Sequence, residues 1–257
     1  MSKKNSTQTA GVIAEIDSIS SSLPDVSTTD LPFETEELRK GLAAFLDKKI
    51  EVDLGSTKKI VRLGAIKWGV YAFYDYDGEP IYVGQTKEKL GTRIRRHLTN
   101  QRTDAVAMNV LDPFEVHSIR VWPLPEFEAT SGKDVNAVEH LNALEYYVFQ
   151  ALLEESKFKA VLNEKDPPPP KTEVPFPASY TDKVVSDAVS KLRDHPDLRI
   201  ARRALTLAKL AQVISERKVQ KGLRRTLLAQ AKRLQALAQS RYEHAAENGE
   251  EDGDEKD

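Results

Sequence analysis

The pattern of apolar and polar positions predicts a hairpin of two strands in the first half of the chain. The runs Gly69–Tyr74 (GVYAFY) and Pro80–Gln85 (PIYVGQ) are rich in aromatic and β-branched residues, which is typical of strands. Residues 75–79 between them contain an Asp-Gly step, a strong signal for a hairpin turn. We therefore expect the two runs to pair in antiparallel fashion across this turn.

Further elements of both kinds surround the hairpin. Partial alternation of apolar residues over Phe114–Trp122 predicts a third strand, which Pro123 and Pro125 end. Apolar positions spaced by three or four residues predict amphipathic helices. The other predicted elements are helices over Thr35–Lys48, Thr92–Asn100 and Asp134–Glu155 and short strands over Ile50–Leu54 and Ile60–Leu63. The fold class that follows is α+β, with a small antiparallel three-stranded sheet flanked by helices.

The last part of the chain is predicted to be helical. Pro167–Pro170 is a stiff run of four prolines that neither a helix nor a sheet accommodates. Beyond it, the apolar pattern over Tyr180–Arg241 is helical, with breaks near Pro196 and Gly222. This spacing fits either a helical hairpin or a dimerising pair of helices.

Composition narrows the class of protein. The 257 residues suffice for one or two domains with a core, and 40% of them are hydrophobic. No apolar run approaches the ~20 residues that span a bilayer, and no apolar core of a secretion signal follows Met1. Because cysteine is absent, disulfides, Cys-based zinc sites and cysteine nucleophiles are excluded. We expect a cytoplasmic protein that does not enter a membrane.

The net charge of −2 hides a strong separation of charge along the chain. Between Lys183 and Arg241, 15 Lys and Arg far outnumber the Asp and Glu, whereas His244–Asp257 holds seven Asp and Glu against one lysine. A basic segment beside an acidic tail is typical of nucleic-acid binders. A solvated helical surface with a solubilising tail is the alternative interpretation.

Residues suited to phosphodiester chemistry follow the hairpin in order. The tripeptide GVY ends at Tyr71, and the tripeptide YVG begins at Tyr82, with ten residues between the two tyrosines. Arg93 and His97 stand four residues apart on a predicted helix and therefore share a face. Glu145 lies beside the apolar stripe of a later helix. Hydrolysis of a phosphodiester needs an activated water and a counter-charge for the phosphate, and these five side chains can supply both.

This ordered set resembles the GIY-YIG endonuclease superfamily. Valine replaces isoleucine in both tripeptides, and the element from Arg93 to His97 is similar to the Arg-x3-His of the GIY-YIG restriction endonucleases. Asn163 is similar to the asparagine that closes the family's core. The resemblance implies a GIY-YIG nuclease core over residues 67–166. It also implies a single-carboxylate site at Glu145 for Mg²⁺, with Mn²⁺ as the alternative ion.

The predicted catalytic residues are Tyr71, Tyr82, Arg93, His97, Glu145 and Asn163. Arg93 offers a planar, permanently charged group to phosphate oxygens. The resemblance implies that Tyr71 is the base or the water-orienting group and that Tyr82 is a second phenol for water or phosphate. His97 is the alternative base, and the sequence leaves open which residue takes the proton. Glu139 is a weaker rival for the metal site.

The expected function is divalent-metal-dependent cleavage of double-stranded DNA by a restriction or other defence endonuclease. A repair, structure-specific or mobile-element nuclease, a catalytically inactive DNA-binding module and a protein-interaction scaffold are the alternatives. Because cutting both strands generally needs two active sites, a homodimer is expected. The residues expected to contact DNA are Arg95, Arg96, Arg202, Arg203, Arg224 and Arg225.

The chain is expected to fall into six segments. In order, they are a flexible N-terminal segment (1–34), an N-terminal helix with short strands (35–66), the nuclease core (67–166), a proline-rich linker (167–180), a basic helical region for DNA binding or dimerisation (181–243) and an acidic disordered tail (244–257). The fold class is thus an α+β core followed by an all-α basic C-terminal region.

Overall fold

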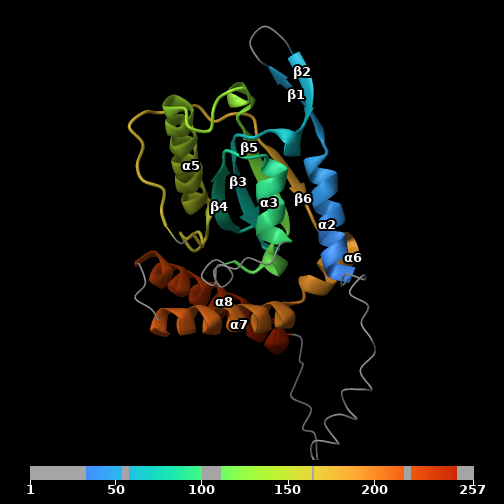
Figure 1. Ribbon diagram of the computed structural model, residues 1–257. Helices are drawn as coiled ribbons and strands as arrows, with labels where there is room; N and C mark the ends of the chain where they lie inside the picture. Colours follow the sequence, from blue (N-terminus) through green and yellow to red (C-terminus); the bar gives the residue numbers. More distant parts are fainter. Residues whose placement is uncertain (1–32, 54–57, 100–110, 164, 217–220, 248–257) are drawn as a thin grey trace, which may run out of the picture. The chain divides into compact units, whose positions relative to one another are not determined.

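The computed structural model describes residues 33–53, 58–99, 111–163, 165–216 and 221–247 (Figure 1). Almost all of the predicted flexible N-terminal segment and most of the predicted acidic tail lie outside these residues. The described residues from Glu34 onward form one compact unit. They contain both helices and antiparallel sheets, which confirms the α+β class.

The central element is an antiparallel sheet of four strands in the order β4-β3-β5-β6. These strands are β3 (Gly69–Tyr74), β4 (Pro80–Thr86), β5 (Ser118–Pro123) and β6 (Tyr180–Lys183). All residues of β3 are buried, because this strand pairs with β4 on one side and with β5 on the other. The predicted hairpin between β3 and β4 is confirmed, and Gly78 in its turn has a φ of 72°, which favours glycine.

The fourth strand corrects the predicted sheet of three strands and the helix predicted to begin at Tyr180. Residues 180–183 pair with β5, from Val121 opposite Tyr180 to Ser118 opposite Lys183. This pairing satisfies the backbone groups along the otherwise open edge of β5. The helix begins only after Ser186, whose hydroxyl accepts a hydrogen bond from a backbone amide of the first turn.

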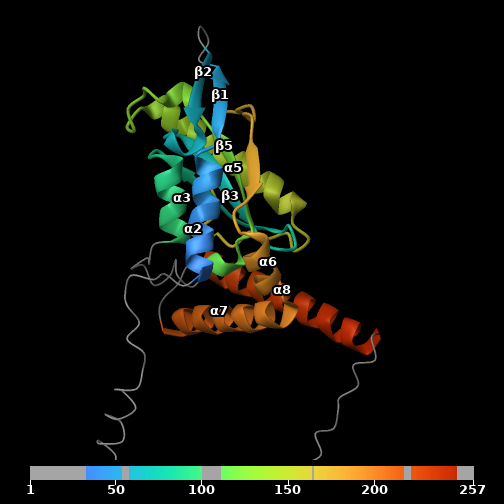
Figure 2. The same ribbon diagram turned by 90° about the vertical axis from the view of Figure 1, so that its right-hand side faces the viewer.

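Helices cover both faces of the sheet (Figures 1 and 2). One face packs against α2 (Phe33–Leu46) and α3 (Leu90–Leu98), and the other packs against α5 (Val135–Glu155). Because successive residues of a strand point to opposite faces, β3 supplies Tyr71 to the first layer and Val70 to the second.

Shorter elements connect these layers. Strands β1 (Lys49–Asp53) and β2 (Lys58–Arg62) form a separate antiparallel hairpin in the region where two short strands were predicted. The single-turn helices η1 (Leu63–Ala65), η2 (Pro113–Glu115) and η3 (Pro125–Phe127) precede or follow strands of the main sheet. The helix predicted over Asp134–Glu155 is confirmed, and the side chain of Asp134 caps its first turn by accepting a hydrogen bond from the amide of Ala137.

The chain is helical after β6. The helices are α6 (Asp187–Arg193), α7 (Pro196–Glu216) and α8 (Lys221–Glu247), and α7 packs along α8. The apolar residues Leu198 and Leu205 of α7 are exposed, whereas arginines lie on its buried side. None of the helices described is long and apolar enough to cross a membrane.

A cluster of ionised side chains joins α7 and α8 to the β3–β4 turn. This ion cluster consists of Asp75, Asp77, Glu115, Arg199, Arg203 and Arg233. Arg203 donates to Asp75 at 3.1 Å and to Glu115 at 3.0 Å, and Arg233 also donates to Asp75. All three arginines and Asp75 are buried, so the mutual pairing offsets the cost of removing these charges from water. The helical region therefore holds the turn of the hairpin that carries both motif tyrosines.

Candidate active site

Three rings from three elements meet on the α3 side of the sheet. Tyr71 of β3 and Tyr82 of β4 have ring centroids 6.3 Å apart. The ring of His97 from α3 lies 5.7 Å from the Tyr71 ring and 5.2 Å from the Tyr82 ring. The structure thus brings together both predicted phenols and the predicted histidine.

Gly84 leaves room for the Tyr71 ring. The two residues lie opposite each other in the β3–β4 ladder. A Cβ atom at position 84 would lie 2.6 Å from the Tyr71 hydroxyl oxygen and 2.9 Å from Cε1 of Tyr82. Both distances are far shorter than a normal contact between these atoms, so the packing of the tyrosines requires glycine here.

We expect Gly84→Ala to lower the free energy of unfolding by about 1–3 kcal/mol, because the added methyl group must displace Tyr71 or the strand. Gly132→Ala is a suitable control, since a Cβ at that position would meet no atom within 4 Å. Urea unfolding followed by circular dichroism measures both variants. Equal stability of the two variants would contradict the close packing of Tyr71 on Gly84.

Arg93 brings a positive charge to the Tyr71 hydroxyl. Its Nε donates to the Tyr71 oxygen over 3.4 Å, a long hydrogen bond. Burial raises the pKa of Tyr71 well above its ordinary value, and the charge of Arg93 opposes this shift only in part. Tyr71 is therefore a neutral phenol at neutral pH. In this state it can orient a water molecule or a phosphate, but it does not remove a proton unaided.

Gln85 links Glu145 of α5 to strand β4. Its Nε2 donates to Oε2 of Glu145 at 3.0 Å and to Oδ1 of Asn142 at 2.8 Å. Burial raises the pKa of Glu145 to about 7, while the hydrogen bond from Gln85 and the charge of Arg93 favour the carboxylate. The negative charge of Glu145 also contributes to the raised pKa of Tyr71, so the Glu145 carboxylate is electrostatically coupled to the Tyr71 hydroxyl.

The raised pKa of Glu145 makes protein stability depend on pH. Since the folded-state pKa of about 7 exceeds the ordinary value of 4.5, the folded protein binds more protons than the unfolded chain between these values. We therefore expect the melting temperature of the wild type, without divalent ions, to fall relative to that of Glu145→Gln as the pH rises from about 5 to about 8. Thermal unfolding at several pH values measures this difference. A difference that is constant with pH would rule out the raised pKa.

The donor set around Glu145 fits a hard, largely hydrated divalent cation. Within the described residues, no three His, Asp or Glu side chains gather into a metal cage. Oε2 of Glu145 accepts a hydrogen bond from Gln85, whereas Oε1 accepts none from any residue that the structure describes. Mg²⁺ usually keeps several waters and needs only one or two carboxylates. Glu139, the predicted rival, is exposed on the same helix.

The side chain of Asn163 supports strand β4 by hydrogen bonding to the backbone of that strand. Its Oδ1 accepts from the amide of Val83 at 3.0 Å, and its Nδ2 donates to the carbonyl of Val83 at 2.8 Å. Thr226 of α8 in turn donates to the carbonyl of Asn163 at 3.2 Å. The side chain therefore acts like a strand partner at the edge of β4, next to Tyr82, and positions this strand.

The two arginines of α3 that were predicted to contact DNA differ in their surroundings. Arg95 is exposed on the side of α3 that faces α2. Arg96 makes two hydrogen bonds with the carboxylate of Glu88, at 2.6 and 2.8 Å. Only Arg95 therefore presents a guanidinium that carries no ion pair within the described residues.

The four arginines of α7 and α8 also differ. Arg203 is buried in the ion cluster, so its guanidinium lies inside the protein and not on the surface that its predicted role in DNA binding requires. Arg202 is partly buried, with its guanidinium 4.8 Å from an aromatic ring. Arg225 forms an ion pair with Asp166, and Arg224 is exposed.

Comparison with known proteins gives a family match. Residues 67–155 match the model of the GIY-YIG catalytic domain. This segment starts just before β3, ends with α5 and contains all of the predicted catalytic residues except Asn163. No curated protein and no solved structure matches the chain. Together with the grouped tyrosines, arginine, histidine and carboxylate, the match supports the assignment of residues 67–155 to the GIY-YIG superfamily as a nuclease domain.

Proposed function

We propose that the protein is a divalent-metal-dependent endonuclease that hydrolyses phosphodiester bonds of double-stranded DNA. The observation that carries this proposal is the contact of the Tyr71, Tyr82 and His97 rings in one cluster. Arg93 is hydrogen-bonded to Tyr71, and Glu145 interacts electrostatically with both Tyr71 and Arg93. These are the side chains that the sequence order had selected, and they lie within the segment matched by the family.

Each of these residues has its own role in the hydrolysis of the phosphodiester bond. Arg93 places its guanidinium against the phosphate and stabilises the charge that develops in the transition state. Tyr71 orients the attacking water through its neutral hydroxyl, and Tyr82 provides a second hydroxyl for water or phosphate. His97, in contact with both rings, is the group that takes a proton from the water or from Tyr71.

Glu145 and Gln85 are the residues that would hold the divalent ion. Bound Mg²⁺ or Mn²⁺ supplies positive charge that offsets the charge on the reacting phosphate. Gln85 fixes the orientation of the Glu145 carboxylate through the hydrogen bond to Oε2. Because the pKa of Glu145 lies at about 7, a proton competes with the cation for this carboxylate below neutral pH.

We further propose that the enzyme is a restriction or other defence nuclease that acts as a homodimer. Two active sites are generally needed to cut both strands of a duplex. The exposed apolar residues Leu198 and Leu205 of α7 provide a surface on which a second copy can pack. A repair, structure-specific or mobile-element nuclease has the same chemistry and differs in the DNA that it selects.

Incubation of the purified protein with supercoiled plasmid, with Mg²⁺ and with a chelator, tests the proposal. We expect cleavage only with the divalent ion, and sequencing of the ends identifies the cut positions. Defined double-strand ends support a dimeric restriction enzyme, whereas scattered nicks support one of the other nuclease roles. Duplex binding without any cleavage under these conditions would contradict the enzyme and favour an inactive DNA-binding module.

A further inference from the structure

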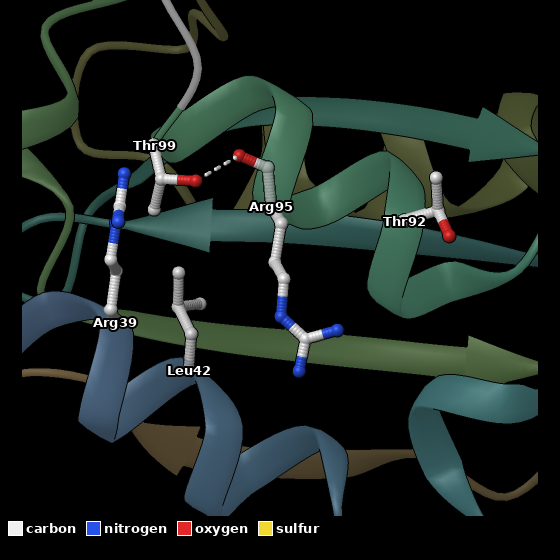
Figure 3. Close-up of a pocket in the computed structure, with 5 residues that line it drawn as sticks. All are labelled: Arg39, Leu42, Thr92, Arg95 and Thr99. Atoms are coloured by element: carbon white, nitrogen blue, oxygen red, sulfur yellow. Dashed lines mark hydrogen bonds between the residues drawn. The ribbon is translucent and has the colours of Figure 1, made fainter.

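A groove runs between α2 and α3, on the flank of α3 that faces away from Arg93. Its larger part is a pocket of about 520 Å³ lined by Arg39, Leu42, Thr92, Arg95 and Thr99 (Figure 3). Figure 3 shows that Arg39 from α2 and Arg95 from α3 both extend into the space between the two helices, on either side of Leu42.

The groove continues beyond this pocket. An adjoining pocket of about 380 Å³ shares Thr92 and Arg95 with the first and adds Arg62, Lys89 and Asp47 to the lining. The two pockets therefore lie next to each other along α3, between the side of α2 and the β2–η1 connection. We call the two pockets together the α2–α3 groove.

The α2–α3 groove carries an excess of positive charge. Among the described residues, its lining holds four cationic side chains, Arg39, Arg62, Lys89 and Arg95, against one carboxylate, Asp47, which gives a net charge of 4 − 1 = +3 for this part of the lining. Asp47 approaches Arg62 at 3.6 Å. Within the described residues, the other three cationic groups have no ion pair. Like charges that face one another across a groove repel, and an anion between them relieves this repulsion.

The position of the groove relates it to the candidate active site. Arg93 and Arg95 are two residues apart on α3 and therefore lie about 200° apart around the helix axis, on opposite flanks. A helix is roughly 10–12 Å across with its side chains, and one strand of duplex DNA advances about 3.4 Å per nucleotide. A strand whose phosphate lies at Arg93 thus reaches the groove after about three nucleotides if it crosses the exposed surface of α3.

We propose that the α2–α3 groove binds backbone phosphates of the DNA substrate a few nucleotides from the bond that is cut. The inference rests on the proposed nuclease function and adds a substrate-binding subsite that includes α2, an element outside the segment matched by the family. Arg39 and Arg95 are the principal phosphate contacts. Thr92, which is exposed on α3 and lines the same pocket, adds a hydroxyl donor.

Salt-dependent DNA binding tests the groove. The double variant Arg39→Ala/Arg95→Ala is compared with Lys40→Ala/Lys133→Ala, which removes the same formal charge from exposed positions outside the groove. Both are made in Glu145→Gln, and the Kd for a labelled duplex is measured by fluorescence anisotropy at several salt concentrations without divalent ions. We expect the groove variant to bind roughly tenfold or more weakly and to lose about 1.8 from the slope of log Kd against log salt, about 0.9 for each lost phosphate contact.

The possible outcomes distinguish failure of the groove proposal from failure of the nuclease proposal. If the wild type cleaves plasmid but the groove variant matches its control in Kd and in slope, the groove proposal is overturned and the nuclease proposal stands. If the wild type neither binds nor cleaves duplex DNA, the proposed function fails, and the subsite fails with it. Thr92→Glu, which places a negative charge in the groove at an exposed helical position, provides a second variant and is expected to weaken binding in the same way.

Discussion

Replacing Glu145 by glutamine is expected to reduce plasmid cleavage by at least about 10³-fold, because the amide keeps the shape of the side chain but removes the anionic ligand of the divalent ion. DNA binding is expected to change little, since Glu145 is half-buried beside Gln85 and contributes no positive charge. Cleavage of supercoiled plasmid with Mg²⁺ measures the first effect, and anisotropy with a labelled duplex measures the second.

Glu139→Gln is the control for this experiment, because Glu139 is an exposed carboxylate on α5, the helix that also carries Glu145. It is expected to cleave like the wild type. Full activity of Glu145→Gln together with loss of activity in Glu139→Gln would transfer the metal site to Glu139. Full activity of both variants would remove the single-carboxylate site from the proposal.

Replacing Arg203 by alanine is expected to lower the free energy of unfolding by about 3–5 kcal/mol. The guanidinium of Arg203 donates to Asp75 and to Glu115, both of which are buried, so its removal leaves carboxylates without one of their counter-charges. Burial already raises the pKa of Glu115 despite the neighbouring arginines. Urea unfolding at neutral pH measures the loss of stability.

The control for this prediction is Arg224→Ala, which removes an exposed arginine of the same region. Its effect is expected to remain within about 0.5 kcal/mol. A loss of less than about 1 kcal/mol for Arg203→Ala would mean that the ion cluster contributes no more than a surface ion pair does.

Elements with local signals were predictable from the sequence. The β3–β4 hairpin has an Asp-Gly turn between aromatic and β-branched runs, and α5 has apolar positions at regular helical spacing. The structure confirms both elements. Strand β6 was not predictable in this way, because it is four residues long and its pairing partner β5 lies more than 50 residues earlier in the chain. Strand formation of this kind depends on a distant edge and not on local pattern.

In the candidate site, too, some residues were predictable from the sequence and others were not. The family order selected Tyr71 and Arg93, which the structure joins by a hydrogen bond. Sequence reasoning missed Gln85, although it directly follows the YVG tripeptide, and alternation along a strand places it on the face opposite Gly84, toward α5. The buried position of Arg203 had no signal, because a buried arginine of a helix is indistinguishable in sequence from a solvated one when its acidic partners are 88 and 128 residues away.

The ion cluster also limits how this nuclease domain can be exchanged between proteins during evolution. The carboxylates of Asp75 and Glu115 belong to the segment that matches the family, while the arginines that neutralise them come from α7 and α8. A gene fusion that joined the segment to an unrelated partner would leave these acids buried without counter-charges. Recombination therefore has to transfer the terminal helices together with the hairpin, or replace the acids of the turn at the same time.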